Sequence, residues 1–425
     1  MRAQKPHGFI LIMSVYVLLV VSILSLSVSA RSLAETMTAR QYFWSDSAFS
    51  LAEAALDETM SRFRSGTFTD WSALFGGGDY SATVDPPTPP PPPDGGHRLV
   101  TAHGRMQSHS RDIEAIVNVD PFSVFQYPLF GDQLLDLRGN VETDSYNSTL
   151  GAYGACLSGC TGLNPVYNIG SNGDLGTNAT YSDATVAGPP TSGIAISGSS
   201  VIINGQVNFG SGTTDPMTEL TQDSITGNAS PTITGSPDAV AMSSPLLLPP
   251  VVVPVGLTCT DLTILSFQTE TLAPGEYCYH DLNMGAPNAL GAVGPAVLNV
   301  TGNVTIYISG TIHASGSSFI GNTSKPSYTV FQLASPVGAM ITTATLTGTT
   351  QLYGAIYAPD SAVTLSGTVD IYGSITAYSI RQTGDVQVHY DEGLEERDDS
   401  PPGGYTTDVM FWRDCDPSDG SGCST

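Results

Sequence analysis

The stretch FILIMSVYVLLVVSILSLSVSA, residues 9–30, contains 22 residues and no charge. A helix of about 20 apolar residues is long enough to cross the hydrocarbon core of a bilayer, so this stretch predicts a transmembrane helix. The short segment before it carries Arg2 and Lys5. Because positive charge is typical of the cytoplasmic side of a membrane segment, we expect a single pass with the amino end in the cytoplasm.

The helical pattern continues beyond the membrane segment. From Leu33 to Phe63, apolar residues recur at spacings of three, four and seven, and charged residues fall on the opposite side. Gly66 lies just past Arg64, where helices commonly end. We therefore predict one helix over residues 9–65, about 84 Å long for residues 9–64 at about 1.5 Å per residue. Its first half is apolar and its second half amphipathic, so it can lie in a membrane and later pack against copies of itself.

Two motifs of this region resemble those of a known family. Gly8-Phe9 at the head of the apolar helix resembles a prepilin peptidase site. The run LAETMTARQYFWSDSAFSLAEAALDETM, residues 33–60, resembles the amino-terminal segment of PilX-type minor pilins and related pilus-assembly proteins. The resemblance implies a leader at residues 1–8 that prepilin peptidase removes, methylation of Phe9, and a stem that packs against other pilins. The residues that it assigns to stem packing are Glu35, Met37, Phe49, Ala52, Glu53 and Leu56.

One departure and two alternatives limit this interpretation. Major type IV pilins carry Glu at the fifth mature position, where this sequence has Met13, so the resemblance is to minor or accessory pilins. Val28-Ser29-Ala30 also resembles the cleavage site of a secretory signal, although the apolar part of such a signal spans only about 7–15 residues. A permanent membrane anchor is the second alternative.

The composition favours a β-rich surface protein. Only 12% of the residues are charged, while Gly numbers 45 and Pro 29 in a chain of 425 residues. The formal net charge is −25, and Lys325 is the only basic residue between Arg138 and Arg381. We therefore expect no binding of nucleic acid, heparin-like chains or acidic sugars through that region, because cations that could neutralise phosphates or carboxylates are lacking.

The six cysteines form three local pairs in the sequence. They are Cys156 and Cys160, Cys259 and Cys278, and Cys415 and Cys423. An even number beyond a membrane segment favours disulfides made in an oxidising periplasm, and nearest-neighbour pairing is one of 15 combinations. A zinc site is not expected, because no complementary His pair lies nearby.

The remaining chain divides by composition. Residues 66–96 form a Gly/Pro-rich linker, and residues 97–119 alternate in the manner of a β-hairpin. From about Phe122, short β runs alternate with Gly, Asn, Ser and Asp turns. Residues 396–425 form an acidic tail, in which we expect a strand with Val409, Phe411 and Trp412 to cover an end of the preceding domain.

An internal repeat decides the architecture expected for residues 120–395. Leu346-Thr347-Gly348-Thr349 returns as Leu365-Ser366-Gly367-Thr368, and residues 353–358 return as residues 372–377, both after 19 positions. A period of about 20 residues is the length of one turn of a β-solenoid. We predict an irregular right-handed β-helix, with its handedness taken by analogy, and a loop or spanning segment at Pro245–Pro254. The fold class is thus mainly β with a long N-terminal helix, transmembrane and then amphipathic.

This region carries a second resemblance. Residues 137–148, 271–284, 353–367 and 386–394 resemble an uncharacterised β-helical domain that is often joined to PilX-type amino termini. The resemblance implies architecture and assigns no catalytic residue.

An enzyme, a metal site and a cofactor are not expected. His97, His103 and His109 recur every six residues without a supporting Cys or carboxylate pattern. Arg381 and Lys325, the basic residues of the repeat region, have no clustered partner in the sequence, and Asp360 and Asp370 have no carboxylate 19 positions away. His389 and Asp391 share one face of a strand, but a capping role explains them equally well.

The sequence therefore predicts a minor pilin or pilus-associated structural protein that displays its β-helix for assembly priming or adhesion. Its expected partners are other pilins, the pilus assembly machinery, prepilin peptidase and the inner membrane, and a surface glycan or a host or abiotic surface is a further candidate. We expect it in the inner membrane before assembly and in an extracellular pilus afterwards. The alternatives are a pseudopilin-like secretion component and an anchored envelope protein that binds glycan.

Overall fold

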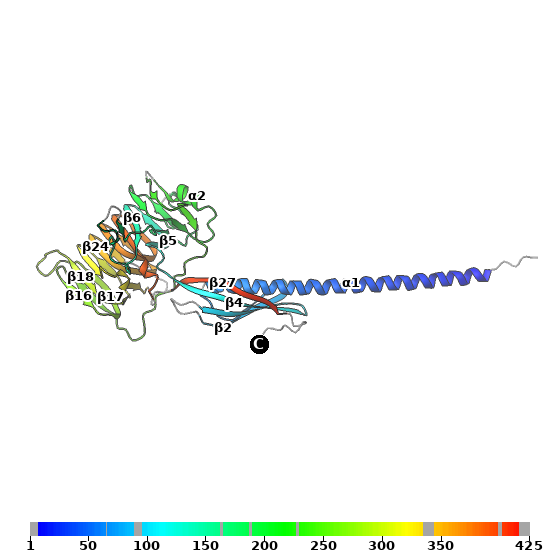
Figure 1. Ribbon diagram of the computed structural model, residues 1–425. Coiled ribbons are helices and arrows are strands. Elements are labelled where there is room, and N and C mark those ends of the chain that lie inside the picture. The colour runs from blue at the N-terminus through cyan, green and yellow to red at the C-terminus, as the bar shows by residue number, and fades with distance from the viewer. Residues whose placement is uncertain are drawn as a thin grey trace, which may run out of the picture. The chain divides into compact units, whose positions relative to one another are not determined.

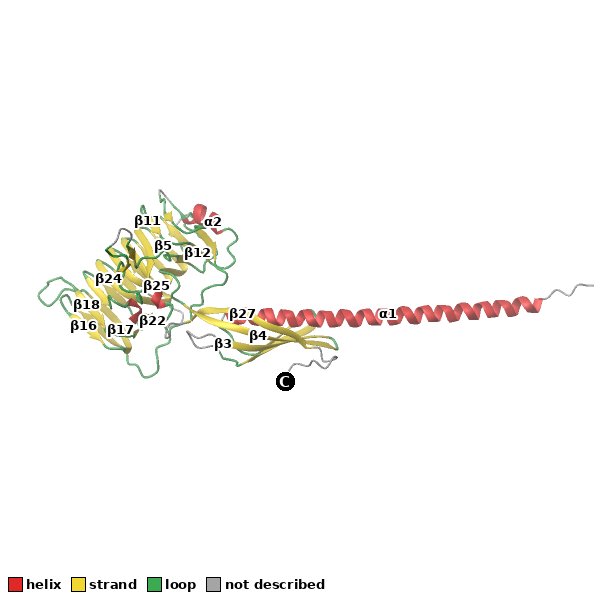
Figure 2. Cartoon of the chain, in the orientation of Figure 1, coloured by secondary structure: helices red, strands yellow, loops and turns green. Residues whose placement is uncertain are grey.

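The computed structural model describes residues 7–64, 66–88, 96–161, 165–186, 189–226, 229–334, 344–397 and 402–415. These residues are mainly β, with one long N-terminal apolar helix (Figure 2), as the sequence predicts. The chain divides into two compact units. The stem unit comprises Met1–Pro89, Gly96–Val119 and Thr407–Thr425, and the parallel-strand unit comprises Pro90–Gly95 and Asp120–Thr406.

The helix α1 is continuous from His7 to Arg64, a length of 58 residues. It ends where Gly66 takes a positive φ of 76°, a conformation that glycine adopts without the steric cost of a Cβ atom. The N–H groups of Gly66 and Thr67 then donate to the carbonyls of Phe63 and Arg62, both at 2.8 Å. The last turn of α1 is thereby closed, which is the usual role of a glycine just past a helix.

The second half of α1 packs on a sheet of the same unit, in which β1 to β4 are antiparallel. The strands follow the order β1 (Trp71–Phe75), β2 (Gly78–Asp85), β3 (Gly96–Met106), β4 (His109–Ser123) and β27 (Pro402–Cys415). Ala52 and Ala55 of α1 are fully buried against Ala102 of β3 and Ile113 of β4. Small side chains on both sides let the helix backbone approach the sheet closely.

Two expectations about this unit are wrong. The predicted linker at residues 66–96 contains β1 and β2, whose pairing buries Ala82 and Val84. The predicted capping strand with Val409, Phe411 and Trp412 belongs to β27 and lies beside β4. The chain of the parallel-strand unit is thus inserted between two neighbouring strands of the stem unit's sheet. Pairing with β27 satisfies an edge of β4 that would otherwise present unpaired backbone groups.

The parallel-strand unit is built from short strands that pair in parallel with strands of the neighbouring layer. They are β5 (Leu129–Leu137), β6 (Asn140–Tyr146), β9 (Leu175–Gly176), β10 (Gly193–Ile196), β11 (Val201–Ile203), β12 (Val207–Phe209), β13 (Thr232–Ile233), β14 (Ala239–Ala241), β15 (Thr260–Ile264), β16 (Thr269–Leu272), β17 (Gly275–Met284), β18 (Ala296–Val300), β19 (Val304–Ile308), β20 (Ile312–Ala314), β21 (Ser318–Gly321), β22 (Thr329–Leu333), β23 (Ala344–Leu346), β24 (Thr349–Leu365), β25 (Thr368–Gln382) and β26 (Asp385–Asp391). Outside this sheet lie the pair β7 (Cys156–Ser158) and β8 (Val166–Tyr167) and the short helices α2 (Pro216–Thr218), η1 (Glu219–Ser224), η2 (Pro326–Tyr328) and η3 (Glu392–Leu394).

The 19-residue repeat appears directly in the strand register. Thr349 lies opposite Thr368 and Tyr353 opposite Tyr372 where β24 pairs with β25. The aliphatic residues between these positions point inward and form one continuous core across the layers. Each layer therefore buries its apolar side chains against the next, an arrangement consistent with a β-helix-like solenoid.

The layers do not stack in the order of the sequence. The chain enters the stack at β5 and passes through β10 and β12 to β14 at one end. Residues 242–259 lead to β15 at the other end, and the chain returns through β17, β19 and β22 to β24 and β25. There β25 pairs with β5, so that cyan and orange strands lie side by side in Figure 1.

The proline-rich segment at Pro245–Pro254 makes the connection between the two ends. Leu248 and Val251 pack against a buried cluster that includes Phe125 and Tyr357. The Tyr357 hydroxyl donates to the Pro249 carbonyl at 2.6 Å. The segment therefore runs along the stack as a covering strap, which extended proline-rich backbone can do without a strand partner.

We predict that Gly104→Ala loosens α1 from its sheet. A Cβ at this position would lie 2.0 Å from the Ala48 carbonyl oxygen and 2.4 Å from the Ala52 nitrogen, both backbone atoms of α1. Overpacking of this kind destabilises a core by about 1–3 kcal/mol. Trp44, Trp71 and Trp412 are the protein's three tryptophans and all belong to the stem unit, so tryptophan fluorescence during denaturant unfolding follows this unit alone.

The matched control is Arg105→Ala, which removes an exposed side chain at the next position of β3. It should change the free energy of unfolding by less than about 0.5 kcal/mol. Equal midpoints for the two variants would contradict the close contact between β3 and α1.

Candidate functional site

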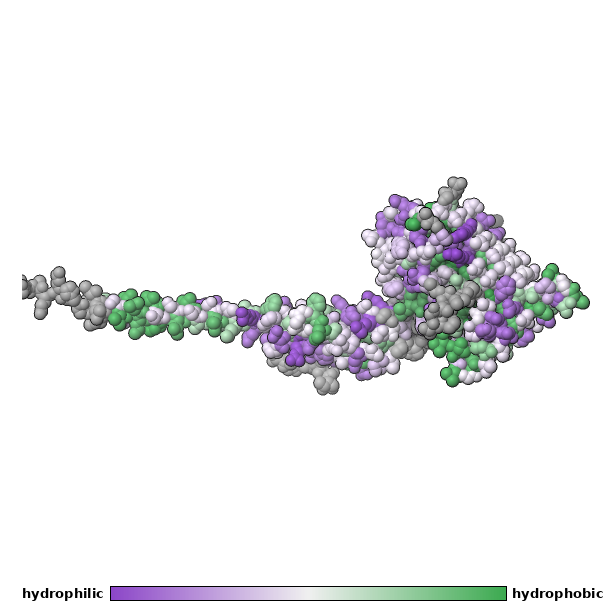
Figure 3. Space-filling view, turned by 180° about the vertical axis from the view of Figure 1, so that it is seen from behind, coloured by the Kyte–Doolittle hydropathy of each residue, from purple (hydrophilic) through white to green (hydrophobic). Residues whose placement is uncertain are grey.

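The first half of α1 exposes apolar side chains on all sides. In the most apolar 18-residue window of Met13–Arg64 the mean hydropathy is 2.2 and no residue is buried. Figure 3 shows apolar side chains along the visible face of this part of the helix. Large side chains such as Leu18, Leu26 and Val28 are 66–76% exposed. By length and composition this helix can cross a membrane, which agrees with the predicted apolar segment.

The residues predicted for stem packing divide into two groups. Ala52 is buried, and Phe49 and Leu56 pack around it against the sheet of the same chain. Glu35, Met37 and Glu53 are exposed, with Met37 at 58%. Their contact with other stems remains a prediction that rests on the exposed group.

The predicted processing site lies in the first turn of α1. The backbone of Gly8 and Phe9 is helical, since α1 begins at His7, and the side chain of Phe9 lies outside the described residues.

Glu35 forms an ion pair with Arg31 at 3.0 Å, one helical turn earlier. Exposed pairs of this spacing stabilise a helix only slightly.

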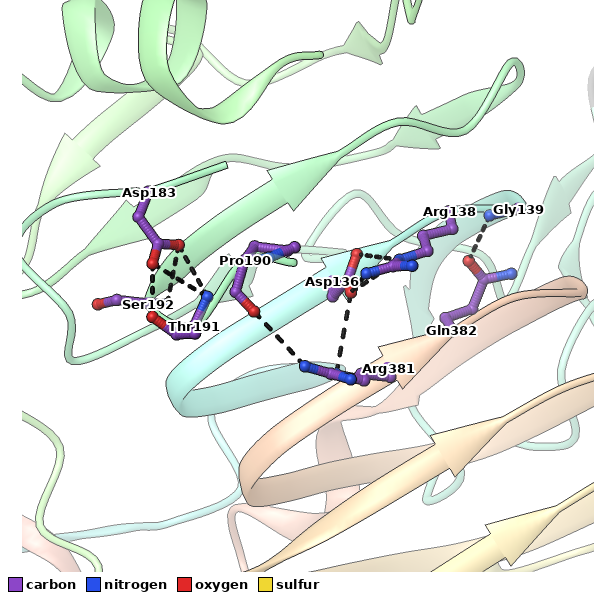
Figure 4. A network of polar contacts seen from close by, with 9 residues as sticks. All are labelled: Asp136, Arg138, Gly139, Asp183, Pro190, Thr191, Ser192, Arg381 and Gln382. Carbon is purple, nitrogen blue, oxygen red and sulfur yellow. Dashed lines mark hydrogen bonds and ion pairs between the residues drawn. The ribbon is translucent and has the colours of Figure 1, made fainter. Parts of the chain in front are cut away.

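In the parallel-strand unit, two arginines meet at a buried carboxylate (Figure 4). Asp136 of β5 is 1% exposed. The Nε of Arg138 donates to its two oxygens at 3.0 and 2.9 Å, and Nη2 lies 2.7 Å from Oδ2. Arg381 is the register partner of Asp136 on β25, and its Nε lies 3.9 Å from the same Oδ2. The expectation that nothing clusters with Arg381 is therefore wrong, because β25 and β5 become neighbours only in the folded chain.

A cavity of about 400 Å³ lies beside this cluster. It is lined by Asp136, Arg138, Ala184, Pro189, Pro190, Ala195, Ser197 and Thr226. The Pro190 side of the cavity is held by Asp183, which accepts hydrogen bonds from the backbone N–H groups of Thr191 and Ser192 at 2.8 and 3.0 Å. Burial opposes ionisation of Asp183, but the hydrogen bonds from Thr191 and Ser192 outweigh it and lower the pKa of this carboxyl.

A second buried polar cluster lies at the end of a stack of aromatic rings that includes Tyr353. The Tyr353 and Tyr372 rings stack at 4.4 Å between centroids, and the His389 ring follows at 4.9 Å. His389 Nδ1 lies 2.7 Å from Asp144 Oδ1, and the Tyr153 hydroxyl donates to Asp144 Oδ2 at 2.6 Å. Burial raises the pKa of Tyr353 to about 12, so its phenol remains protonated at neutral pH.

The other members of the run His389 to Glu392 also bind the chain itself. Asp391 accepts hydrogen bonds from the N–H groups of Ser148 and Gly393 at 2.9 and 3.1 Å. Burial raises the pKa of the Asp391 carboxyl, and this effect is larger than the lowering caused by the hydrogen bonds. Tyr390 hydrogen-bonds to the Phe125 carbonyl and the Glu395 carboxylate. These contacts give each group a structural role in joining distant parts of the chain.

The other predicted residues fall as follows. Cys156 is bonded to Cys160 and Cys259 to Cys278, as the nearest-neighbour pairing predicts. Cys423, the expected partner of Cys415, lies outside the described residues. His103 pairs with Asp112 at 2.8 Å across β3 and β4. Within the described ranges no three His, Cys, Asp or Glu side chains come together as a metal site.

One part of the chain matches a known family. The family described as "Domain of unknown function (DUF7305)" matches residues 293–397, which include the 19-residue repeat. No curated protein matches. Among solved structures, the competence-associated pilin ComZ from Thermus thermophilus matches 88% of this chain and 96% of its own with 10% identity and a TM-score of 0.25, which is too low to carry an argument. The PilX-type resemblance of residues 33–60 remains a prediction.

We predict that Asp144→Asn weakens the parallel-strand unit. The substitution removes the charge that pairs with His389 and leaves one carbonyl oxygen in place of two carboxylate oxygens, so either His389 or Tyr153 loses an acceptor. An unsatisfied buried group costs about 1–3 kcal/mol. Calorimetry should show a lower melting transition for this unit, while tryptophan fluorescence, which follows the stem unit, should not change.

Glu142→Gln is the control, because Glu142 lies two positions earlier on β6 and is only partly buried. It should leave both transitions in place. A melting profile for Asp144→Asn that equals that of the unchanged protein would show that the His389 pair contributes nothing.

Proposed function

We propose that this protein is a pilin-like subunit whose stem leaves the inner membrane to pack in a pilus or a pseudopilus. The single observation that supports this function is the contrast between the two halves of α1. The first half exposes an apolar surface all round, and the second half is anchored on the sheet of its own unit. A helix of this design is held rigidly at one end and needs a surrounding apolar medium at the other.

Two media can surround the apolar half. Lipid chains cover it in a bilayer, and the apolar stems of other subunits cover it in a fibre. The residues that remain exposed farther along α1, such as Glu35 and Met37, would then contact neighbouring stems. Because Met13 stands where major pilins carry Glu, the role proposed is that of a minor subunit.

The parallel-strand unit would be the displayed part. We propose that it is an irregular right-handed β-helix that primes assembly or contacts a surface, and that it is not an enzyme. The acid–base candidates His389 and Asp391 support a structural role, since both bind groups of the chain itself. A pseudopilin-like secretion component and a permanently anchored envelope protein remain the competing functions.

The first test is the amino-terminal sequence and intact mass of the mature protein from its native membrane. We expect a chain that begins at N-methylated Phe9, because Gly8 and Phe9 resemble a prepilin peptidase site. Gly8→Leu should block cleavage and leave the leader in place, while Ala3→Leu, a substitution of similar size farther from the bond, should be processed normally.

Other amino termini would contradict the proposal in different ways. A chain that begins at Arg31 would be a secreted protein without the apolar half of the stem, and a chain that retains Met1 would be a permanent anchor. If processing occurs, detection of the subunit in sheared extracellular fibres would favour a pilus. Its restriction to the cell envelope would favour a pseudopilus.

A further inference from the structure

The cluster at Asp136 gathers positive charge in a unit that has very little of it. Residues 120–406 contain 24 acidic and four basic residues, a net charge of −20. Two of the four basic side chains, Arg138 and Arg381, lie against the single carboxylate of Asp136. The cluster therefore carries a net charge of about +1 at a place where the average composition would give a negative one.

Arg138 satisfies the buried carboxylate without help from Arg381. Its three contacts with Asp136 are all within 3.0 Å and form the bidentate geometry that arginine and carboxylate prefer. Arg381 lies 3.9 Å from the same carboxylate, beyond hydrogen-bonding distance, and donates to the Pro190 carbonyl at 3.5 Å. Within the described part of the chain, the Arg381 guanidinium therefore keeps N–H donors that make no hydrogen bond.

The cavity beside the cluster combines polar and apolar walls. Ser197 and Thr226 line it, and their hydroxyls make no hydrogen bond to the described residues. Pro189 and Ala195 supply apolar surface in the same cavity. Arg381 is not itself a lining residue, but its guanidinium contacts two of them, Asp136 and the carbonyl of Pro190 (Figure 4). A ligand that fits must offer an anion to the arginines, hydroxyl groups to Ser197 and Thr226, and a C–H face to the apolar wall.

We propose that this cavity binds a carboxylated sugar, such as a hexuronic acid unit of an acidic polysaccharide. The sugar carboxylate would accept hydrogen bonds from Arg381, and from the part of Arg138 that Asp136 does not occupy. Arginine suits this role because its planar fork binds carboxylates in two parallel hydrogen bonds. The ring hydroxyls and C–H groups of the sugar match the remaining walls.

Acidic sugars are not expected to bind between Arg138 and Arg381, because Lys325 is the only basic residue in that part of the sequence. The folded chain supplies the missing positive charge at this cavity. The two arginines that bound this gap are brought together because β25 pairs with β5, while Ala195 comes from β10 on the other side of β5. The site therefore exists only where these three strands stack, and it does not depend on the function of the stem.

Galacturonate is the probe for this proposal. Its binding to the full-length protein in detergent, measured by calorimetric titration, should be at least tenfold tighter than binding of galactose or of galacturonate methyl ester. Both control sugars lack the charge and keep the ring. Arg381→Gln should weaken galacturonate binding about tenfold or more, as expected for the loss of a charged hydrogen-bonding partner.

Lys325→Gln is the matched control for charge. Lys325 is another exposed basic residue of the same unit, and it lines a different cavity. Its substitution should leave galacturonate binding unchanged. Ser197→Ala should weaken binding of galacturonate but not that of acetate, which distinguishes recognition of the sugar from attraction of any carboxylate. Unchanged melting of Arg381→Gln would establish that the loss is local.

Four outcomes would overturn the proposal. They are no measurable binding of galacturonate to the unchanged protein, equal binding of galacturonate and galactose, equal affinity in Arg381→Gln, and acetate or an acidic peptide bound as tightly as galacturonate. The last outcome would assign the two arginines to a general anion site or to a protein partner.

Discussion

The parallel pairing of β25 with β5 is the contact on which the parallel-strand unit depends. It joins residues that are about 245 positions apart and, together with the neighbouring pairing of β26 with β6, closes a stack whose two halves the proline-rich strap connects along the chain. Ile375, Ile380 and Leu135 are fully buried in the core that runs across this junction. Without the junction, each half of the stack would expose an additional edge, which is the known liability of open β structures.

Polar groups reinforce the same junction and give it a single register. The Gln382 side chain accepts from the Gly139 N–H at 2.9 Å, the Ser374 hydroxyl donates to the Tyr127 carbonyl at 2.5 Å, and His389 pairs with Asp144. A shift of one residue would turn each of these groups to the wrong face, because side chains alternate along a strand.

The stem unit solves a different problem, that of holding a long helix of which half is exposed and apolar. Its sheet is completed by β27, which returns to β4 after the whole parallel-strand unit. The stem and its sheet are therefore one folded body despite the insertion, and small residues such as Ala52, Ala102 and Gly104 set the close approach between them. The proposed roles separate accordingly: the stem would anchor and assemble, and the inserted unit would present the arginine cavity.

The sequence alone determined the features that depend on neighbouring residues. These are the long helix from its periodicity and its end at Gly66, the stacking of layers from the 19-residue repeat, and the disulfides Cys156–Cys160 and Cys259–Cys278 from proximity in the chain. Only the tertiary structure decided which distant strands become neighbours. The return of β27 to β4, the entry of the chain at the middle of the stack, and the meeting of Arg138 with Arg381 all follow from such pairings. Composition and periodicity describe which face of a strand is buried, but they contain no information about which remote strand will cover its edge.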